Sequence, residues 1–324
     1  MAAPSASHRR GRIQRRARRQ RIIILGGGHG VASVLGALHG ELLELTVIVT
    51  TADDGGSSGE LRRRWGIAAV GDMRRTLIAM AGEDGDFGRA FARPVSIARL
   101  GRHPLGNLVL AALSDAFGEL EAASAWICDQ LGLTGRVLPA TTFPVSLVAE
   151  EPEGLVRGES AIGAAPGRIV RLRFDPRDPS VPTAALEAIT DADWVLLGPG
   201  SLFTSVLAVS ALPEIVSELA STHARVLWIC NLAPQYPETL DMTAGDHLDA
   251  LRRHGVRVDA VLYDPDAPLT FTAQQLAESE LPALSRHMQS TDPAVHDPAS
   301  LHAALYELFT GAADPLRPVA TCAT

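Results

Sequence analysis

The sequence contains few cysteines, few aromatic residues and no long apolar run. Its three cysteines are far apart and odd in number, which argues against a disulfide framework or a cysteine-based metal site. No apolar run reaches the roughly 18 residues that a membrane span requires. Residues 1–20 contain no apolar core segment, so we expect no signal peptide and a cytoplasmic location. A hydrophobic content of 46% is still enough for a sizeable core.

Signatures of several enzyme and binding classes are also missing. A Ser-His-Asp hydrolase is the weaker interpretation, and there is no H-E-x-x-H or comparable set of metal ligands. The net charge of −8 is unlike that of a nucleic-acid-binding domain. Only the Arg-rich residues 1–20 are suited to contact RNA, anionic lipid or an acidic partner, and we expect them to form a disordered arm.

Apolar segments that alternate with helical patterns are the main feature of the chain. Strands are predicted at residues 21–25, 45–49, 194–197, 225–230 and 258–263, with helices between them that include residues 202–220 and 243–254. This alternation is typical of an α/β fold, a Rossmann-like doubly wound sheet that is mostly parallel.

The same patterns predict how the chain is organised. We expect a single nucleotide-binding domain over residues 21–311, with a loose tail at residues 312–324. Short alternating segments broken by proline and glycine predict an inserted β-hairpin region at residues 135–175. From residue 272 onward the pattern is helical.

A glycine loop follows the first predicted strand and precedes a helix. It comprises Gly26, Gly27, Gly28, His29 and Gly30. A strand, a glycine loop and a helix in this order present a phosphate to the helix N-terminus. The spacing lacks the third glycine of the dinucleotide fingerprint. The loop therefore indicates an anion site without specifying a dinucleotide.

A second loop, DDGGSSG, follows the next strand. Its residues are Asp53, Asp54, Gly55, Gly56, Ser57, Ser58 and Gly59. Glycine amides and serine hydroxyls can converge on a phosphate. The two aspartates can bind a divalent cation such as Mg²⁺ or accept from a sugar hydroxyl. A surface turn is the alternative, since these residues are common in turns.

Other polar residues stand at predicted helix starts. Arg74 or Arg75 can clamp a phosphate, while Asp72 is interpreted as a helix cap. His103, which precedes the helix over residues 108–116, is either an acid–base group or a structural hydrogen-bonding group.

Two further sites complete the set of candidates. Asn107 can contact a base, a sugar or the backbone. The Gly200-Ser201 turn is a second anion-binding candidate.

Six motifs together resemble one known family. GGGHG, TADDGGSSGELR, GDMRR, HPLGN, GPGSLFTS and CNLAPQYPET occur in order between about residues 21 and 264. They are similar to those of the YvcK/CofD-like family, in the YvcK branch known as gluconeogenesis factors. This chain has His29 where Thr is usual and Arg75 where Asn is usual, and Ala233-Pro234 alters a Met-Thr-Gln segment.

The resemblance implies a Rossmann-like protein of the cytoplasm that binds a nucleotide or UDP-sugar. It also implies a regulatory role in cell shape and wall-precursor supply on gluconeogenic carbon sources, with regulators of wall synthesis as partners. The sequence leaves the oligomeric state open, with a homo-oligomer as one option. CofD relatives instead transfer a phospholactyl group from a nucleotide-activated donor to a deazaflavin, with a divalent metal. That transferase activity is the first alternative, and an NAD-binding oxidoreductase is the second.

Overall fold

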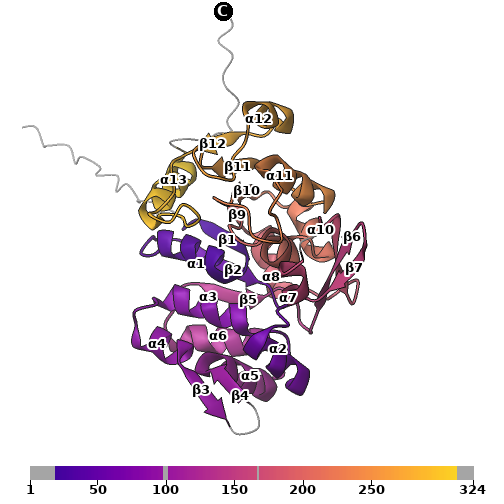
Figure 1. Cartoon of the computed structure of the whole chain (residues 1–324). Coiled ribbons are helices and arrows are strands. Elements are labelled where there is room, and N and C mark those ends of the chain that lie inside the picture. Colours follow the sequence, from indigo (N-terminus) through magenta and orange to yellow (C-terminus); the bar gives the residue numbers. More distant parts are fainter. Residues whose placement is uncertain (1–18, 98–100, 166–167, 312–324) are drawn as a thin grey trace, which may run out of the picture.

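A seven-stranded sheet forms the centre of the computed structural model, which describes residues 19–97, 101–165 and 168–311 (Figure 1). Its strand order is β12-β11-β10-β9-β1-β2-β5, and every pair is parallel. The strands are β1 (Arg21–Gly26), β2 (Glu44–Val49), β5 (Arg136–Pro139), β9 (Trp194–Leu197), β10 (Arg225–Ile229), β11 (Ala260–Tyr263) and β12 (Ala283–Ser285). The predicted α/β, doubly wound class is confirmed.

The apolar runs of the sequence are explained by burial of the sheet on both faces. In β1, Ile22 and Ile24 belong to one hydrophobic cluster, whereas Ile23 and Leu25 belong to the other. Because successive side chains of a strand point to opposite faces, a strand covered on both sides must be apolar at every position.

Helices cover the two faces, as Figure 1 shows. One side carries α1 (Gly28–Ala37), α3 (Gly71–Ala81), α5 (Leu105–Phe117), α6 (Leu120–Gln130) and α13 (Pro298–Thr310). The other carries α8 (Thr183–Thr190), α9 (Leu207–Ser210), α10 (Pro213–Ser221) and α11 (Ala244–Arg253). Three more helices are α2 (Gly56–Trp65), α4 (Asp86–Ala92) and α12 (Ala273–Ser279).

The predicted insertion contains an antiparallel sheet of three strands in the order β7-β6-β8. These are β6 (Ser146–Glu151), β7 (Gly154–Arg157) and β8 (Arg171–Asp175), and the short helix α7 (Glu159–Gly163) follows β7. The predicted insertion boundary is too early, because residues 136–139 form β5, the edge strand of the main sheet.

Three further predictions about elements need correction. β12 lies in the stretch that was predicted to be helical, because the three-residue strand is too short to show a period. The predicted helix 202–220 is broken into a π-helical turn (Leu202–Val206), α9 and α10. His103 lies within β4 (Gly101–Pro104), which pairs with β3 (Pro94–Ile97), and the helix begins at Leu105, before its predicted start at residue 108.

Within the described ranges, no single helix is long and apolar enough to cross a membrane. The segments Leu202–Ser210 and Pro213–Ser221 meet that length and composition only as a pair bent by 66°. The predicted Arg-rich arm and C-terminal tail lie outside the described residues, apart from Arg19 and Gln20.

Candidate functional site

The glycine loop after β1 touches the loop after β9 where the order of the strands reverses. β1 pairs with β2 on one side and with β9 on the other. In open α/β sheets, ligands bind beyond the carboxyl ends of the strands at this point. A Cβ atom at Gly30 would overlap the carbonyl oxygen of Pro199. Glycine at position 30 therefore allows the two loops to meet.

The DDGGSSG segment leads directly into α2 and lines a cavity of about 370 Å³, called cavity 1 below. Gly55, Gly56, Ser57 and Ser58 form one wall of it. Within the described part of the chain, no side chain caps the N-terminus of α2. Its first-turn amides thus remain available as donors, and the helix dipole adds partial positive charge there. These features support the phosphate role predicted for residues 55–58.

The two aspartates of this segment have different neighbours. Asp53 lines cavity 1, and its Oδ1 accepts a hydrogen bond from the Gly55 amide at 2.9 Å. The Oδ1 of Asp54 accepts from the amide of Ser160, in the insertion, at 3.0 Å. Asp53 is therefore placed to contact a ligand in cavity 1, while Asp54 fastens the loop to the insertion.

Other residues that line cavity 1 carry polar atoms that lack partners. Asn107 is only 2% exposed, and its Nδ2 donates to the hydroxyl of Ser57 at 2.9 Å. Asn107 Oδ1 and the Nε atoms of Arg74 and Arg75 are buried without a hydrogen-bond partner among the described residues. Because buried polar atoms are nearly always hydrogen-bonded, three such atoms around one cavity point to a polar ligand.

Asp72 lies between the glycine loop and cavity 1. It is buried, lines the cavity, pairs with Arg75 and accepts a hydrogen bond from the Gly28 amide. Burial raises the pKa of the Asp72 carboxyl, while Arg75 opposes the increase. The interpretation of Asp72 as a helix cap is wrong, because Val70 is the N-cap of α3 and no side chain in the described structure bonds there.

Cavity 1 also contains a carboxyl group that sequence reasoning missed. Glu159 begins α7, directly after Gly158, whose φ is 96°. Burial and, after it, the negative charges of Asp53 and Asp72 raise the pKa of Glu159 to about 7. A carboxyl group with this pKa can take up or release a proton near neutral pH. The glycine at position 158 is the local signal that β7 ends before Glu159.

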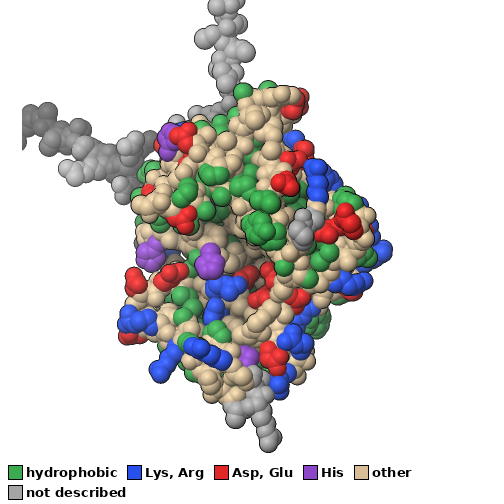
Figure 2. All heavy atoms as spheres, viewed as in Figure 1, with side chains coloured by type: hydrophobic (Ala, Val, Ile, Leu, Met, Phe, Trp, Pro, Cys, Tyr) green, Lys and Arg blue, Asp and Glu red, His purple; other side chains and the backbone are tan. Residues whose placement is uncertain are grey.

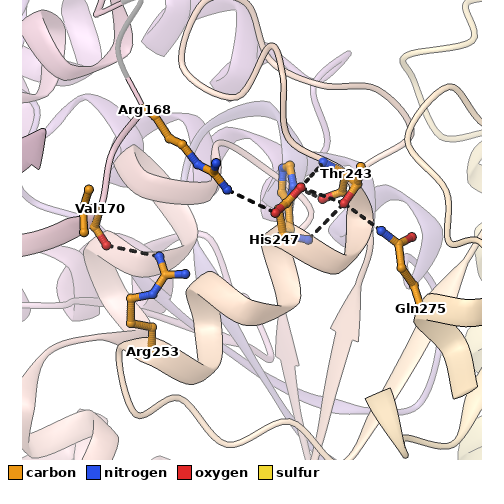
Figure 3. Close-up of polar contacts among 7 residues, drawn as sticks. Arg168, Val170, Thr243, His247, Arg253 and Gln275 are labelled. Carbon is orange, nitrogen blue, oxygen red and sulfur yellow. Dashed lines mark hydrogen bonds and ion pairs between the residues drawn. The ribbon is translucent and has the colours of Figure 1, made fainter. Parts of the chain in front are cut away.

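Residues near the end of the insertion contact α11. The same insertion carries Glu159, at the start of α7. Arg168 reaches Asp246 at 3.4 Å, and Arg253 donates to the carbonyl oxygen of Val170 at 3.2 Å (Figure 3). The same Asp246 forms a capping box with Thr243 at the start of α11. Pairs between exposed side chains contribute little stability each. Their main effect is to orient the insertion relative to the sheet.

The amides of the second glycine loop already have protein acceptors. The side chain of Asn231 accepts from the Gly200 amide at 2.9 Å and donates to the Gly200 carbonyl at 2.7 Å. The carboxylate of Glu238 accepts from two amides at the start of the π-helical turn, and burial raises its pKa. A ligand would therefore meet the surface of this loop and not a free Gly200 amide. The phosphate role of Gly200 and Ser201 stays a prediction.

A second cavity of about 260 Å³, called cavity 2 below, is lined by residues of both glycine loops, namely His29, Gly30 and Gly200. The predicted site residues thus divide between two neighbouring cavities. Cavity 1 receives Asp53, Gly55, Gly56, Ser57, Ser58, Arg74 and Asn107. In the described structure, Gly26, Gly27, Gly28, Asp54, Gly59 and Ser201 line neither cavity. Figure 2 shows a hollow in the middle of the face viewed, bordered by acidic, basic and histidine side chains.

The predicted metal role of Asp53 and Asp54 finds support only at Asp53. Among the described residues, no group of three or more His, Cys, Asp or Glu side chains is arranged to hold a metal ion. Asp53 and Glu159 do supply oxygen atoms to cavity 1, and Mg²⁺ usually combines one or two carboxylates with phosphate oxygens and water. A cation would fit only together with a phosphorylated ligand.

The fold and the loops at its switch point are those of a Rossmann-like α/β protein. The sequence model of one family, described as 2-phospho-L-lactate transferase CofD, matches residues 22–308. The chain therefore belongs to the CofD family.

Individual relatives agree with this assignment. A protein of Mycobacterium leprae named "Putative gluconeogenesis factor" is 37% identical over 317 residues, which cover 92% of this chain and 88% of the relative. A protein of the same name from Streptococcus pyogenes serotype M1 is 38% identical over 251 residues, or 75% of this chain and 77% of the relative. A crystal structure of a UPF0052 family protein from Bacillus halodurans superposes with a TM-score of 0.84 at 32% identity, covering 89% of this chain and 99% of that one.

Proposed function

We propose that this protein is a gluconeogenesis factor that binds a nucleotide-activated sugar, with UDP-sugars as the favoured class. In this role it reports nucleotide-sugar supply to the regulators of cell shape and wall synthesis in the cytoplasm. The names of its relatives support the assignment as a gluconeogenesis factor. The structural support is the architecture of the switch point, where cavity 2 borders the glycine loop that joins β1 to α1, and Asp72 connects this loop to cavity 1.

The observation that carries the proposal is the set of unsatisfied polar atoms around the N-terminus of α2. Free first-turn amides, Arg74 and the amide oxygen of Asn107 all border cavity 1. Hydrogen-bond donors, a cation and a helix dipole together suit a phosphate. The acceptor atoms of Asn107 and Asp53 suit the hydroxyl groups of an attached sugar.

A transferase of the CofD type is the second candidate, and Glu159 is the observation that favours it. In such a reaction an acceptor hydroxyl oxygen would bond to the phosphorus atom of the donor diphosphate, while the bond to the nucleoside monophosphate breaks. Glu159 would take the hydroxyl proton, since its pKa of about 7 permits this near neutral pH. A divalent cation bound through Asp53 and phosphate oxygens would neutralise part of the developing charge.

Calorimetric titration with UDP-sugars, UMP, ADP-ribose and NAD⁺ in the presence of Mg²⁺ tests the binding proposal. We expect UDP-sugars to bind and to raise the melting temperature by mass action, by about 2.7 kcal/mol of stability at a ligand concentration of 100 times Kd. Arg74→Ala should weaken this binding by about 10- to 100-fold, the value of a charged hydrogen bond. Binding of NAD⁺ alone would favour an oxidoreductase instead.

Incubation with a lactyl-diphosphonucleoside donor, a deazaflavin acceptor and Mg²⁺ separates the two candidates. A regulator should bind the UDP-sugar and release no nucleoside monophosphate from the donor. A transferase should release it in a ratio of one to each phosphorylated acceptor, and Glu159→Gln should abolish the release.

A further inference from the structure

Cavity 2 has a recognition chemistry different from that of cavity 1. It lies beyond β9 and β10, next to His29 and Gly30, and its far wall is formed by residues 231–235 and 294–296. Most polar side chains around it are satisfied within the protein. Asn231 is fully engaged with Gly200, and the hydroxyl of Ser33 donates to the carbonyl of His29 at 3.2 Å.

Two acceptor atoms at cavity 2 are the exceptions. The Oε1 of Gln235 and the Nε2 of His296 are buried and have no hydrogen-bond partner among the described residues. His296 is only 5% exposed. Buried polar atoms of this kind are unfavourable when they are left unpaired. Two of them on the wall of one cavity indicate a ligand that donates two hydrogen bonds.

The tautomer of His296 follows from its second nitrogen. The ring donates a hydrogen bond to the backbone of Cys230, and since Nε2 has no partner, Nδ1 is the donor. Burial lowers the pKa of His296 to about 4, although the nearby carboxylate of Asp264 opposes the decrease. That carboxylate is itself bound to the amides of Met288 and Gln289. The ring is therefore neutral at physiological pH, and the lone pair of Nε2 has no donor among the described residues.

The geometry points to cavity 2 as the subsite for the nucleoside half of the ligand, which no sequence pattern assigned. We infer that Gln235 Oε1 accepts from the N3–H group of a uracil base, and that His296 Nε2 accepts from a ribose hydroxyl. The amide of Gln235 also carries donor hydrogens for a carbonyl oxygen next to N3–H, so one side chain matches both groups of the base edge. The diphosphate then extends from Gly30, at the edge of cavity 2, to the N-terminus of α2 and Arg74 in cavity 1, where the sugar also lies.

This inference rests on the proposed function, and modified ligands test it without changing the protein. The probes are UDP-glucose, its N3-methyluracil analogue and its 2′-deoxy and 3′-deoxyribose analogues, titrated calorimetrically with Mg²⁺. The N3-methyl analogue should bind about 10- to 100-fold more weakly, because a buried acceptor loses its donor. One of the two deoxyribose analogues should show a loss of similar size.

Three variants assign each loss to its residue. Gln235→Met keeps the length of the side chain but removes its polar atoms, so it should abolish the penalty for N3-methylation and leave the deoxyribose penalty. His296→Asn retains a donor toward Cys230 and should abolish only the deoxyribose penalty. Ser33→Ala, at the rim of the same cavity, is the matched control and should preserve both penalties.

The outcomes distinguish this inference from the proposed function on which it rests. If UDP-glucose binds but all three analogues bind equally well, the nucleoside subsite is not cavity 2 and only this inference is overturned. The same holds if the variants leave both penalties intact. If UDP-glucose and other UDP-sugars do not bind at all, the proposed function fails as well.

Discussion

Replacement of Glu159 by Gln should stabilise the protein at alkaline pH, and this prediction tests the electrostatics of cavity 1. The folded protein holds the proton of Glu159 up to a pKa of about 7, whereas the ordinary value is 4.5. Between these values the native state binds more protons than the unfolded chain, so stability falls as pH rises through the window. Glutamine resembles the protonated form and avoids this loss.

The size of the effect follows from the separation of the two pKa values. At 1.36 kcal/mol for each pH unit, a complete loss amounts to about 3 kcal/mol. Glu159 is partly exposed, and solvent screening reduces the expected gain to about 1–2 kcal/mol. Urea unfolding in EDTA at pH 5 and pH 8 measures it. The variant and the wild type should have similar stability at pH 5, and the variant should be more stable at pH 8.

The matched control is Glu153→Gln, since Glu153 is exposed in the turn of the same hairpin. It should change stability by less than about 0.5 kcal/mol at either pH. An equal gain for both variants at pH 8 would show that general charge reduction is responsible. No gain for Glu159→Gln would show that the cavity does not disfavour its charge, and would remove the main support for a proton-accepting role.

Further predictions concern the glycine loop, Arg74 at cavity 1 and the buried His296. Gly30→Ala should destabilise the protein by about 1–3 kcal/mol, because its Cβ would overlap the loop after β9. Gly36→Ala in the same helix has open space and should stabilise it by up to about 1 kcal/mol in thermal unfolding. Arg74→Ala should abolish most UDP-sugar affinity in calorimetry, while Arg89→Ala, on an exposed helix, should not. His296→Asn should remove up to about 3 kcal/mol of the stability lost between pH 6.5 and pH 4, where only the unfolded chain protonates this ring.

The fold could be predicted from the sequence because its strongest signals are local. The segments at residues 21–25, 45–49 and 194–197 are apolar at every position, which reflects a sheet that is covered on both faces. β12 was missed because three residues do not establish a periodicity. β5 was placed in the insertion because its position at the sheet edge depends on pairing with the distant β2.

The candidate site could be predicted only in part, for the same reason. The DDGGSSG segment, Arg74 and Asn107 were indicated by residue type and position, and they line one cavity. Glu159 and His296 lie 100 or more residues away from that motif in the sequence, and no local pattern marks them. Asp72 accepts from the Gly28 amide, and Glu238 accepts from the Phe203 amide. Both contacts join residues that are far apart in the sequence, so composition does not reveal them.

The central claim is that one nucleotide-sugar crosses the glycine loop and reaches both cavities. A crystal structure with Mg²⁺ and a bound UDP-sugar measures this most directly. We expect the nucleoside between Gln235 and His296, the diphosphate between Gly30 and the N-terminus of α2, and the sugar beside Asp53 and Asn107. A ligand that is confined to one cavity, or that is bound away from the glycine loop, would contradict the account.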